Sequence, residues 1–359
     1  MRSLYLLGLL VPAALVLELT HAAPALIFTV AALAVIPAAA LMGKATEELA
    51  ARSGPGIGGL LNVTFGNAPE LIIAFFALLA GLQEVVKASI VGSVIGNILL
   101  VLGASMFVGG LGRERQTFNR TAAHAQSAML LLALVALVMP ALFELVKGGS
   151  LPTPGNAPQA FDPDLEKLSF AVAIILIASY AAGLFFSLRT HRRLFNPYGE
   201  GDQDHGGWSV RKSIIVLALA GALVGLMSEV LVGSIKEAAD EIGLSQFFIG
   251  VFIVAIVGNA AEHWVAVLVA YKDKMDLAVN IAIGSSAQVA LFVTPVLVLL
   301  SFVVGPQPLV LIFNGYELGA MLFAVLLANF LTQEGESNWF EGVQLLALYA
   351  VLGLVFFFA

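Results

Sequence analysis

The 359-residue chain contains no cysteine, and Lys, Arg, Asp and Glu together make up only 11% of it. Without cysteine there is no disulfide, no thiol nucleophile and no Cys-ligated metal. Soluble globular domains carry about 25% charged residues, so the low charge excludes an ordinary soluble domain. The sequence has no basic cluster with interleaved aromatic residues, which argues against a nucleic-acid partner. Among metals, hard cations with oxygen ligands remain to be considered.

Hydrophobic residues, by contrast, make up 60% of the chain, and apolar runs recur from one end to the other. A run of about 20 apolar residues crosses a hydrocarbon core as a helix. The runs are too long and too uniformly apolar for barrel strands, which alternate over about 10 residues. The sequence therefore predicts an all-α polytopic membrane protein. Its eleven expected transmembrane helices lie near residues 4–20, 24–50, 57–81, 85–109, 121–143, 167–190, 210–238, 244–271, 275–304, 309–330 and 339–358.

The distribution of Lys and Arg predicts the orientation of these helices. With the N-terminus in the cytoplasm, 13 of the 17 basic residues fall on the cytoplasmic side. Such a bias is the usual determinant of topology, and it places the C-terminus outside. The first apolar segment has a second interpretation, a signal peptide with Arg2 before its core and Thr20-His21-Ala22 as a cleavage site. We favour a retained helix.

An internal repeat is the decisive feature of the sequence. Gly66-Asn67-Ala68-Pro69-Glu70 matches Gly258-Asn259-Ala260-Ala261-Glu262 at an offset of 192 residues, and the same offset relates Gly92-Ser93 to Gly284-Ser285. The first motif lies on the third expected helix and the second on the eighth. Five helices, an odd number, separate the two copies, so the copies enter the membrane from opposite sides. Inverted repeats of this kind place a transport site near the bilayer midplane.

This repeat divides the chain into four parts. We expect an extra N-terminal transmembrane helix at 1–22, a first five-helix repeat at 23–190, a polar cytoplasmic linker at 191–209 and a second five-helix repeat at 210–359. The linker contains Gly199-Glu200-Gly201-Asp202-Gln203-Asp204-His205. We interpret it as a solvated connection, with a regulatory cation site as the less favoured alternative.

Glu70 and Glu262 each lie in the middle of an apolar helix, where a carboxylate costs at least about 2.5–3.5 kcal/mol. Two such residues in repeated positions predict a functional pair; glutamates that only pin helices are the alternative. Asn67 and Asn259 supply amide oxygens, and local unwinding at Gly66 and Gly258 would supply backbone carbonyls. Ca²⁺ takes six to eight oxygen ligands of these kinds. We therefore predict that Glu70 and Glu262 bind both the metal and protons, with Asn67 and Asn259 as further metal ligands.

The helix after each motif adds polar side chains at matched depth. We expect four of them to line the cavity with Gly66 and Gly258, namely Ser93, Asn97, Ser285 and Gln288. The alternative is that they only link helices by hydrogen bonds, which is common for Ser and Asn in membranes.

The stretch Gly59-Leu60-Leu61-Asn62-Val63-Thr64-Phe65-Gly66-Asn67-Ala68-Pro69-Glu70-Leu71-Ile72 resembles the first signature of the Ca²⁺/H⁺ antiporter (cation exchanger, CAX) family. The second motif with His263, and Ile283-Gly284-Ser285-Ser286-Ala287-Gln288-Val289-Ala290-Leu291-Phe292 behind it, resembles the second signature. The likeness covers nearly the whole chain. It implies alternating Ca²⁺ and H⁺ binding at Glu70 and Glu262 and no cofactor. The long N-terminal extension of eukaryotic members is missing, so we expect a prokaryotic cell (inner) membrane.

Charge balance predicts the coupling. The pair is neutral with one Ca²⁺ or with two protons, whereas the empty ionised pair carries two negative charges and cannot easily cross an occluded state. Four residues are candidates for gating or cation entry: Glu47, Glu48, Glu229 and His263. For the three glutamates an interfacial helix-end charge is an equal alternative, and His263 more readily faces a neighbouring helix.

Three other functions are alternatives for such a chain. A Na⁺- or K⁺-coupled divalent cation exchanger of the same fold is the main alternative, although Gly-Asn-Ala before the glutamates argues against Na⁺. An intramembrane metal-dependent hydrolase would need a motif such as His-X-X-X-His, which does not occur. A passive channel would need no coupling to a counter-ion. The sequence leaves open whether the chain forms a homo-oligomer.

Overall fold

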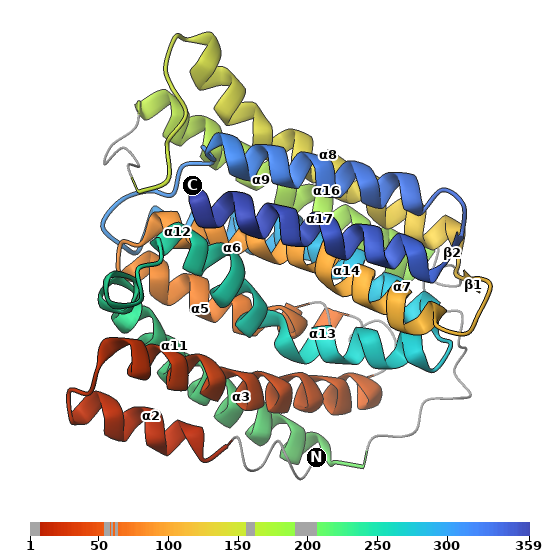
Figure 1. Ribbon diagram of the computed structural model, residues 1–359, viewed down its shortest axis with the longest axis horizontal. Helices are drawn as coiled ribbons and strands as arrows, with labels where there is room; N and C mark the ends of the chain where they lie inside the picture. Colours follow the sequence, from red (N-terminus) through yellow and green to blue (C-terminus); the bar gives the residue numbers. More distant parts are fainter. Residues whose placement is uncertain (1–7, 54–57, 59, 62–63, 156–161, 191–206) are drawn as a thin grey trace.

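The computed structural model describes residues 8–53, 58, 60–61, 64–155, 162–190 and 207–359, which form an all-helical bundle (Figure 1). Among these residues, eight helices are long and apolar enough to cross a membrane. Three shorter apolar helices accompany them, at Leu10–Leu19, Ala68–Leu79 and Gly315–Leu331. The expected all-helical membrane fold is thus present. Most of the predicted linker, and parts of the first and third expected helices, lie outside the described residues.

Several of the long helices contain π-helical segments (η). In chain order the elements are α2 (Leu10–Leu19), α3 (Pro24–Arg52), α5 (Ala68–Leu79), α6 (Gln83–Ile95), η1 (Gly96–Val101), α7 (Leu102–Gly110), β1 (Gln116–Thr117), α8 (Arg120–Val146), α9 (Pro163–Phe185), η2 (Phe186–Thr190), α11 (Val210–Ile242), α12 (Gln246–Phe248), η3 (Ile249–Val254), α13 (Ala255–Tyr271), α14 (Met275–Gln288), η4 (Val289–Val293), α15 (Thr294–Ser301), α16 (Gly315–Leu331), β2 (Glu336–Ser337) and α17 (Trp339–Phe358). The two short strands pair antiparallel, with Gln116 opposite Ser337.

Two of the long helices form the centre of the bundle. In the continuous helix from Gln83 to Gly110, 94% of an apolar 18-residue stretch is buried inside the protein. In the helix from Met275 to Ser301 the corresponding share is 72%. The corresponding share of α17 is only 17%. Most side chains on the two central helices are therefore covered by the surrounding helices.

Small residues let α6 cross η3 in direct backbone contact. A Cβ on Gly92 would lie 2.0 Å from the carbonyl oxygen of Val251, and a Cβ on Gly250 would lie 2.7 Å from the Cβ of Ala88. No side chain fits at either glycine without displacing backbone. This close crossing holds α6, at Ala88 and Gly92, against η3, the segment that leads into α13.

Helices α3 and α11 pack along each other on one side of the bundle, with α2 beside them (Figure 1). The carboxylate of Glu241, at the end of α11, accepts a hydrogen bond of 3.0 Å from the backbone N–H of Ala25 at the start of α3. Helix α5 contacts α11, so this layer adjoins the element that carries Glu70.

The expected helix over 309–330 was wrong at its start, because α16 begins at Gly315 and residues 309–314 are non-helical and buried. Side chains satisfy the backbone of this segment. Leu309 N–H donates to Ser301 Oγ at 2.7 Å, Leu311 N–H donates to Ser169 Oγ at 3.0 Å, and Lys87 Nζ donates to Ile312 O at 2.8 Å. The helix then starts at a capping box in which Asn314 and Glu317 bond each other's backbone N–H.

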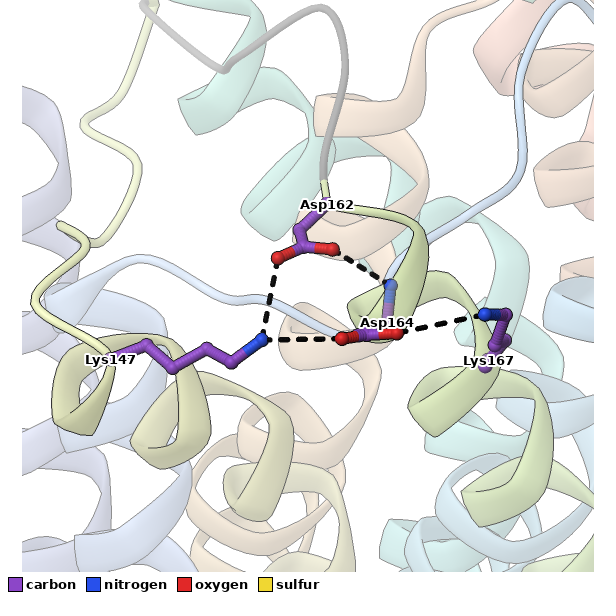
Figure 2. Close-up of polar contacts among 4 residues, drawn as sticks. All are labelled: Lys147, Asp162, Asp164 and Lys167. Carbon is purple, nitrogen blue, oxygen red and sulfur yellow. Dashed lines mark hydrogen bonds and ion pairs between the residues drawn. The ribbon is translucent and has the colours of Figure 1, made fainter.

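An exposed ion-pair cluster connects the end of α8 with the start of α9 (Figure 2). Lys147 Nζ lies 3.4 Å from a carboxylate oxygen of both Asp162 and Asp164, and Lys167 Nζ lies 3.6 Å from Asp164. The backbone N–H of Asp164 donates to the Asp162 carboxylate and, with Lys147, holds the pKa of Asp162 below its usual range. Exposed pairs contribute little to stability, so this cluster is a local connection.

Candidate cation site

Glu70 lies in the first turn of α5, whose N-cap is Asn67. Its side chain is buried, with 9% of the residue exposed. The carboxylate accepts a hydrogen bond from the amide of Asn259 through Oε1, and it also interacts with the hydroxyl of Ser93. Its second oxygen, Oε2, is buried and has no hydrogen-bond partner within the described residues. A buried, partnerless carboxylate oxygen is costly, and it is free to bind a cation or a proton.

Glu262, on α13, lies opposite Glu70. Its Oε1 is 3.4 Å from the position of a Cβ on Gly66, and a Cβ on Gly258 would lie 3.2 Å from Glu70 Cγ. The two carboxylates interact electrostatically, and Glu262 also interacts with the hydroxyl of Ser285. Oε2 of Glu262 is also buried without a partner in the described part of the chain. The two glycine-asparagine motifs therefore face each other, each with its glycine against the other's glutamate.

The two asparagines of the motifs cross between the halves of the chain in equivalent ways. Asn259 Nδ2 donates to Ser93 Oγ at 3.1 Å, and Asn67 Oδ1 accepts from Ser285 Oγ at 3.0 Å. Asn67 and Asn259 are 192 residues apart, as are Ser93 and Ser285. Asn67 also donates through Nδ2 to Gln288 Oε1. Each half thus completes the polar shell around the motif of the other half.

Asn97 and His263 form a further contact at the edge of this shell. His263 Nε2 lies 3.1 Å from Asn97 Oδ1, which joins α13 to the π-helical segment η1. The Nδ2 of Asn97 is buried and has no partner within the described residues. His263 thus faces a neighbouring helix, as expected, and Asn97 contacts His263.

Among the described residues, the polar side chains found around the two glutamates, apart from His263, offer oxygen atoms from carboxylate, amide or hydroxyl groups. Such a set is typical of a site for a hard cation such as Ca²⁺. The fold brings together eight of the predicted site residues around this centre: Gly66, Asn67, Glu70, Ser93, Gly258, Asn259, Glu262 and Ser285. Gln288 joins them through Asn67.

Comparison with known proteins identifies the family of this chain. The family model described as sodium/calcium exchanger protein matches residues 23–189 and 212–358. The chain belongs to this exchanger family. The Ca²⁺/H⁺ antiporter ChaA of Bacillus subtilis (strain 168) is 45% identical over 351 residues, which cover 97% of this chain and 96% of that protein. The resemblance to the Ca²⁺/H⁺ antiporter family is thereby confirmed.

Solved structures of exchangers have the same fold. The structure of native YfkE superposes with a TM-score of 0.84 at 42% identity and covers 99% of both chains. The crystal structure of the H⁺/Ca²⁺ exchanger CAX covers 99% of this chain and 92% of that one, with a TM-score of 0.72 at 16% identity. The latter likeness concerns the fold alone.

The three acidic gate candidates of this exchanger occupy different surroundings. Glu47, on α3, is exposed, and its charge acts on Glu262. Glu48 instead accepts a hydrogen bond of 3.0 Å from the backbone N–H of Trp208, whose ring also lies under Lys44 and Lys212. Glu229 is exposed beyond the midpoint of α11. Glu47 is therefore the candidate with an electrostatic connection to the glutamate pair.

The expectation of unwinding at Gly258 was wrong, because Gly258 and Asn259 lie inside the regular helix α13. The irregular backbone nearest this motif is η3, which ends at Val254, one turn earlier. In the first half the irregularity does fall at the motif, where Asn67 caps α5. Pro69 accounts for the difference, since it lacks an N–H for the preceding turn and has Ala261 as its counterpart.

Sequence reasoning missed two polar contacts between helices. Lys87 of α6 is 5% exposed and interacts with Glu317 of α16, which is 2% exposed. Gln126 of α8 donates to the side chain of Asn280 on α14. Both Lys87 and Gln126 interrupt apolar helices, which was the available signal, but neither lies within the repeated motifs.

Proposed function

We propose that this chain exchanges Ca²⁺ for H⁺ across a membrane. The observation that carries the proposal is the pair of facing glutamates inside a shell of oxygen-bearing side chains from both halves of the chain, each with one buried oxygen that has no partner in the described part of the structure. The name of the Bacillus subtilis relative, which is similar over nearly the whole chain, supports Ca²⁺ and H⁺ as the exchanged ions.

The proposed coupling follows from charge. One Ca²⁺ neutralises two ionised glutamates, and so do two protons. The empty ionised pair would carry two negative charges in a medium where an isolated charge costs several kcal/mol. Loaded and protonated carriers therefore cross the occluded state, whereas empty ones do not. Movement of Ca²⁺ in one direction is tied to movement of protons in the other, by alternating access at Glu70 and Glu262.

The proposed architecture has eleven membrane crossings. Eight are the long apolar helices, and the others are the three shorter apolar helices. We place an extra N-terminal helix at 1–22, inverted five-helix repeats at 23–190 and 210–359, and a cytoplasmic linker between them. The reciprocal contacts Asn259–Ser93 and Asn67–Ser285 support this pseudo-symmetry.

The proposed orientation puts the N-terminus in the cytoplasm and the C-terminus outside, with the prokaryotic inner membrane as location. The excess of Lys and Arg on one side supports it. In this orientation, the turn between α13 and α14, which carries Lys272 and Lys274, faces the cytoplasm.

The test is ⁴⁵Ca²⁺ flux in proteoliposomes that contain the purified full-length chain. We expect uptake when the lumen is acidic and the outside is neutral, and no uptake when an outward Na⁺ or K⁺ gradient replaces the pH gradient. Uptake driven by Na⁺ or K⁺ alone would show a different exchanger of the same fold. Uptake without any gradient of a counter-ion would show a channel.

A further inference from the structure

A pair of amide side chains lies outside the glutamate site, at the contact between α8 and α14. Gln126 Nε2 donates to Asn280 Oδ1. Both side chains lie over Gly284, because a Cβ there would be 3.3 Å from Asn280 Oδ1 and 3.7 Å from Gln126 Oε1. The two amide oxygens therefore lie near the same point on the surface of α14.

Asn280 is the exposed residue of a helix whose other residues are buried or half-buried. Neighbouring helices cover most of α14, so its one exposed side chain marks an opening in that cover. An amide facing hydrocarbon would lose its hydrogen bonds to water at a cost of several kcal/mol. The position is therefore suited to an aqueous vestibule.

Polar side chains continue from this pair to the glutamate site. Asn280, Gly284 and Gln288 are spaced by four residues and so share one face of α14. At 1.5 Å per residue, Gln288 lies about 12 Å deeper along the helix than Asn280. Gln288 accepts from Asn67, which in turn accepts from Ser285. A cation that follows this face would meet oxygen donors at both ends.

The equivalent face of the first half is closed at its middle residue, Gly92. At the repeat offset of 192, the counterparts of Asn280, Gly284 and Gln288 are Ala88, Gly92 and Gly96. A Cβ on Gly92 would collide with the carbonyl oxygen of Val251 at 2.0 Å, so η3 packs directly on this face. The amides thus occur on the face of α14 and not on its counterpart in the first half. Asn280 lies in the first half of α14, and α14 begins on the cytoplasmic side in the proposed orientation.

We propose that Gln126 and Asn280 form a low-affinity Ca²⁺-binding site on the cytoplasmic side, the amide site. There Ca²⁺ exchanges part of its water shell for amide oxygens before it reaches the glutamates. This inference rests on the proposed function. Amide carbonyls are ordinary Ca²⁺ ligands, whereas Mg²⁺ gives up water reluctantly. Because the amides carry no charge, they hold the ion weakly and release it to the carboxylates.

The experiment compares initial rates of pH-driven ⁴⁵Ca²⁺ uptake in everted and right-side-out vesicles that contain the full chain. In Asn280→Leu and Gln126→Met, the KM for Ca²⁺ at the cytoplasmic face should rise about fivefold, which corresponds to about 1 kcal/mol. The KM at the opposite face and the maximal rate should not change. Asn280→Gln, which keeps an amide, should retain a KM near that of the wild type.

Ser127→Ala is the matched control, because Ser127 is the neighbour of Gln126 on α8 and its hydroxyl lies 3.0 Å from Thr332 Oγ1, away from Asn280. It should leave both KM values unchanged. If Asn280→Leu fails to reach the membrane, Gln126→Met decides. If the wild type shows pH-driven flux but the cytoplasmic KM of the variants is unchanged, or rises equally at both faces, the amide site is refuted and the proposed function is not. If the wild type itself shows no pH-driven flux, both the proposed function and the amide site are refuted.

Discussion

Replacing Asn259 by leucine should weaken Ca²⁺ binding without leaving a cavity, because the two side chains have the same number of non-hydrogen atoms with the same branching. The amide of Asn259 donates to Glu70, to Ser93 at 3.1 Å and to the backbone carbonyl of Ala255 at 2.9 Å. A hydrogen bond to a charged group contributes about 1.5–3 kcal/mol. Losing the bond to Glu70 should therefore raise the dissociation constant about 10- to 100-fold at 1.4 kcal/mol per tenfold.

The assay is calorimetric Ca²⁺ titration of the purified protein in detergent at neutral pH, together with the KM of vesicle uptake. Asn329→Leu is the control, because Asn329 Nδ2 makes a comparable bond of 2.9 Å to the Ser127 carbonyl, outside the glutamate site. It should lower thermal stability and leave Ca²⁺ affinity unchanged. Affinity of Asn259→Leu within about twofold of the wild type would refute the assignment of Asn259 to the ion's surroundings, since even one lost bond of 1 kcal/mol gives more.

Three further predictions follow from residues outside the glutamate pair. Glu47→Gln should raise the KM for Ca²⁺ at the cytoplasmic face about two- to fivefold, the size of effect expected for an exposed charge. Glu48→Gln should leave this KM unchanged, because the Glu48 carboxylate accepts a hydrogen bond from the Trp208 backbone. Equal KM values in the two variants would contradict this prediction. In Glu114→Cys the new thiol should react with an impermeant maleimide in everted vesicles only, and in Ser150→Cys in right-side-out vesicles only. No other residue would be labelled, because the native chain has no cysteine. The reverse labelling would show that the orientation is opposite to the proposed one. The lowered pKa of Asp162 implies a stabilisation that is present above its unfolded pKa of about 3.9 and is lost as pH falls through the lower folded pKa. The thermal unfolding temperatures of Asp162→Asn and wild type should therefore differ at neutral pH and approach each other as the pH falls below the pKa of the unfolded chain. A difference that stays constant with pH would contradict this.

The repeated motif was enough to predict which residues meet. The offset of 192 residues pairs Glu70 with Glu262 and Ser93 with Ser285, and the fold places these residues around one centre. Helical membrane segments were equally predictable, because lipid forces the backbone to bond internally and leaves few alternatives. The roles of the two glutamates in exchange stay predictions.

Other features depend on contacts that no local pattern encodes. Residues 309–314 read as apolar helix, yet the segment is non-helical, since Ser301, Ser169 and Lys87 from distant helices satisfy its backbone. Gly258 was expected to unwind like Gly66, but without a following proline its helix stays regular. Gln126 and Asn280 meet across two helices 154 residues apart in sequence.

The most direct measurement is pH-driven ⁴⁵Ca²⁺ uptake by proteoliposomes that contain Glu70→Gln or Glu262→Gln, beside an exposed glutamate variant, Glu237→Gln. Each buried glutamine leaves the site unable to reach neutrality with both Ca²⁺ and protons, so uptake should fall to the level of empty liposomes while Glu237→Gln transports like the wild type. Wild-type rates in either buried variant would contradict the central claim that these two carboxylates bind the exchanged ions.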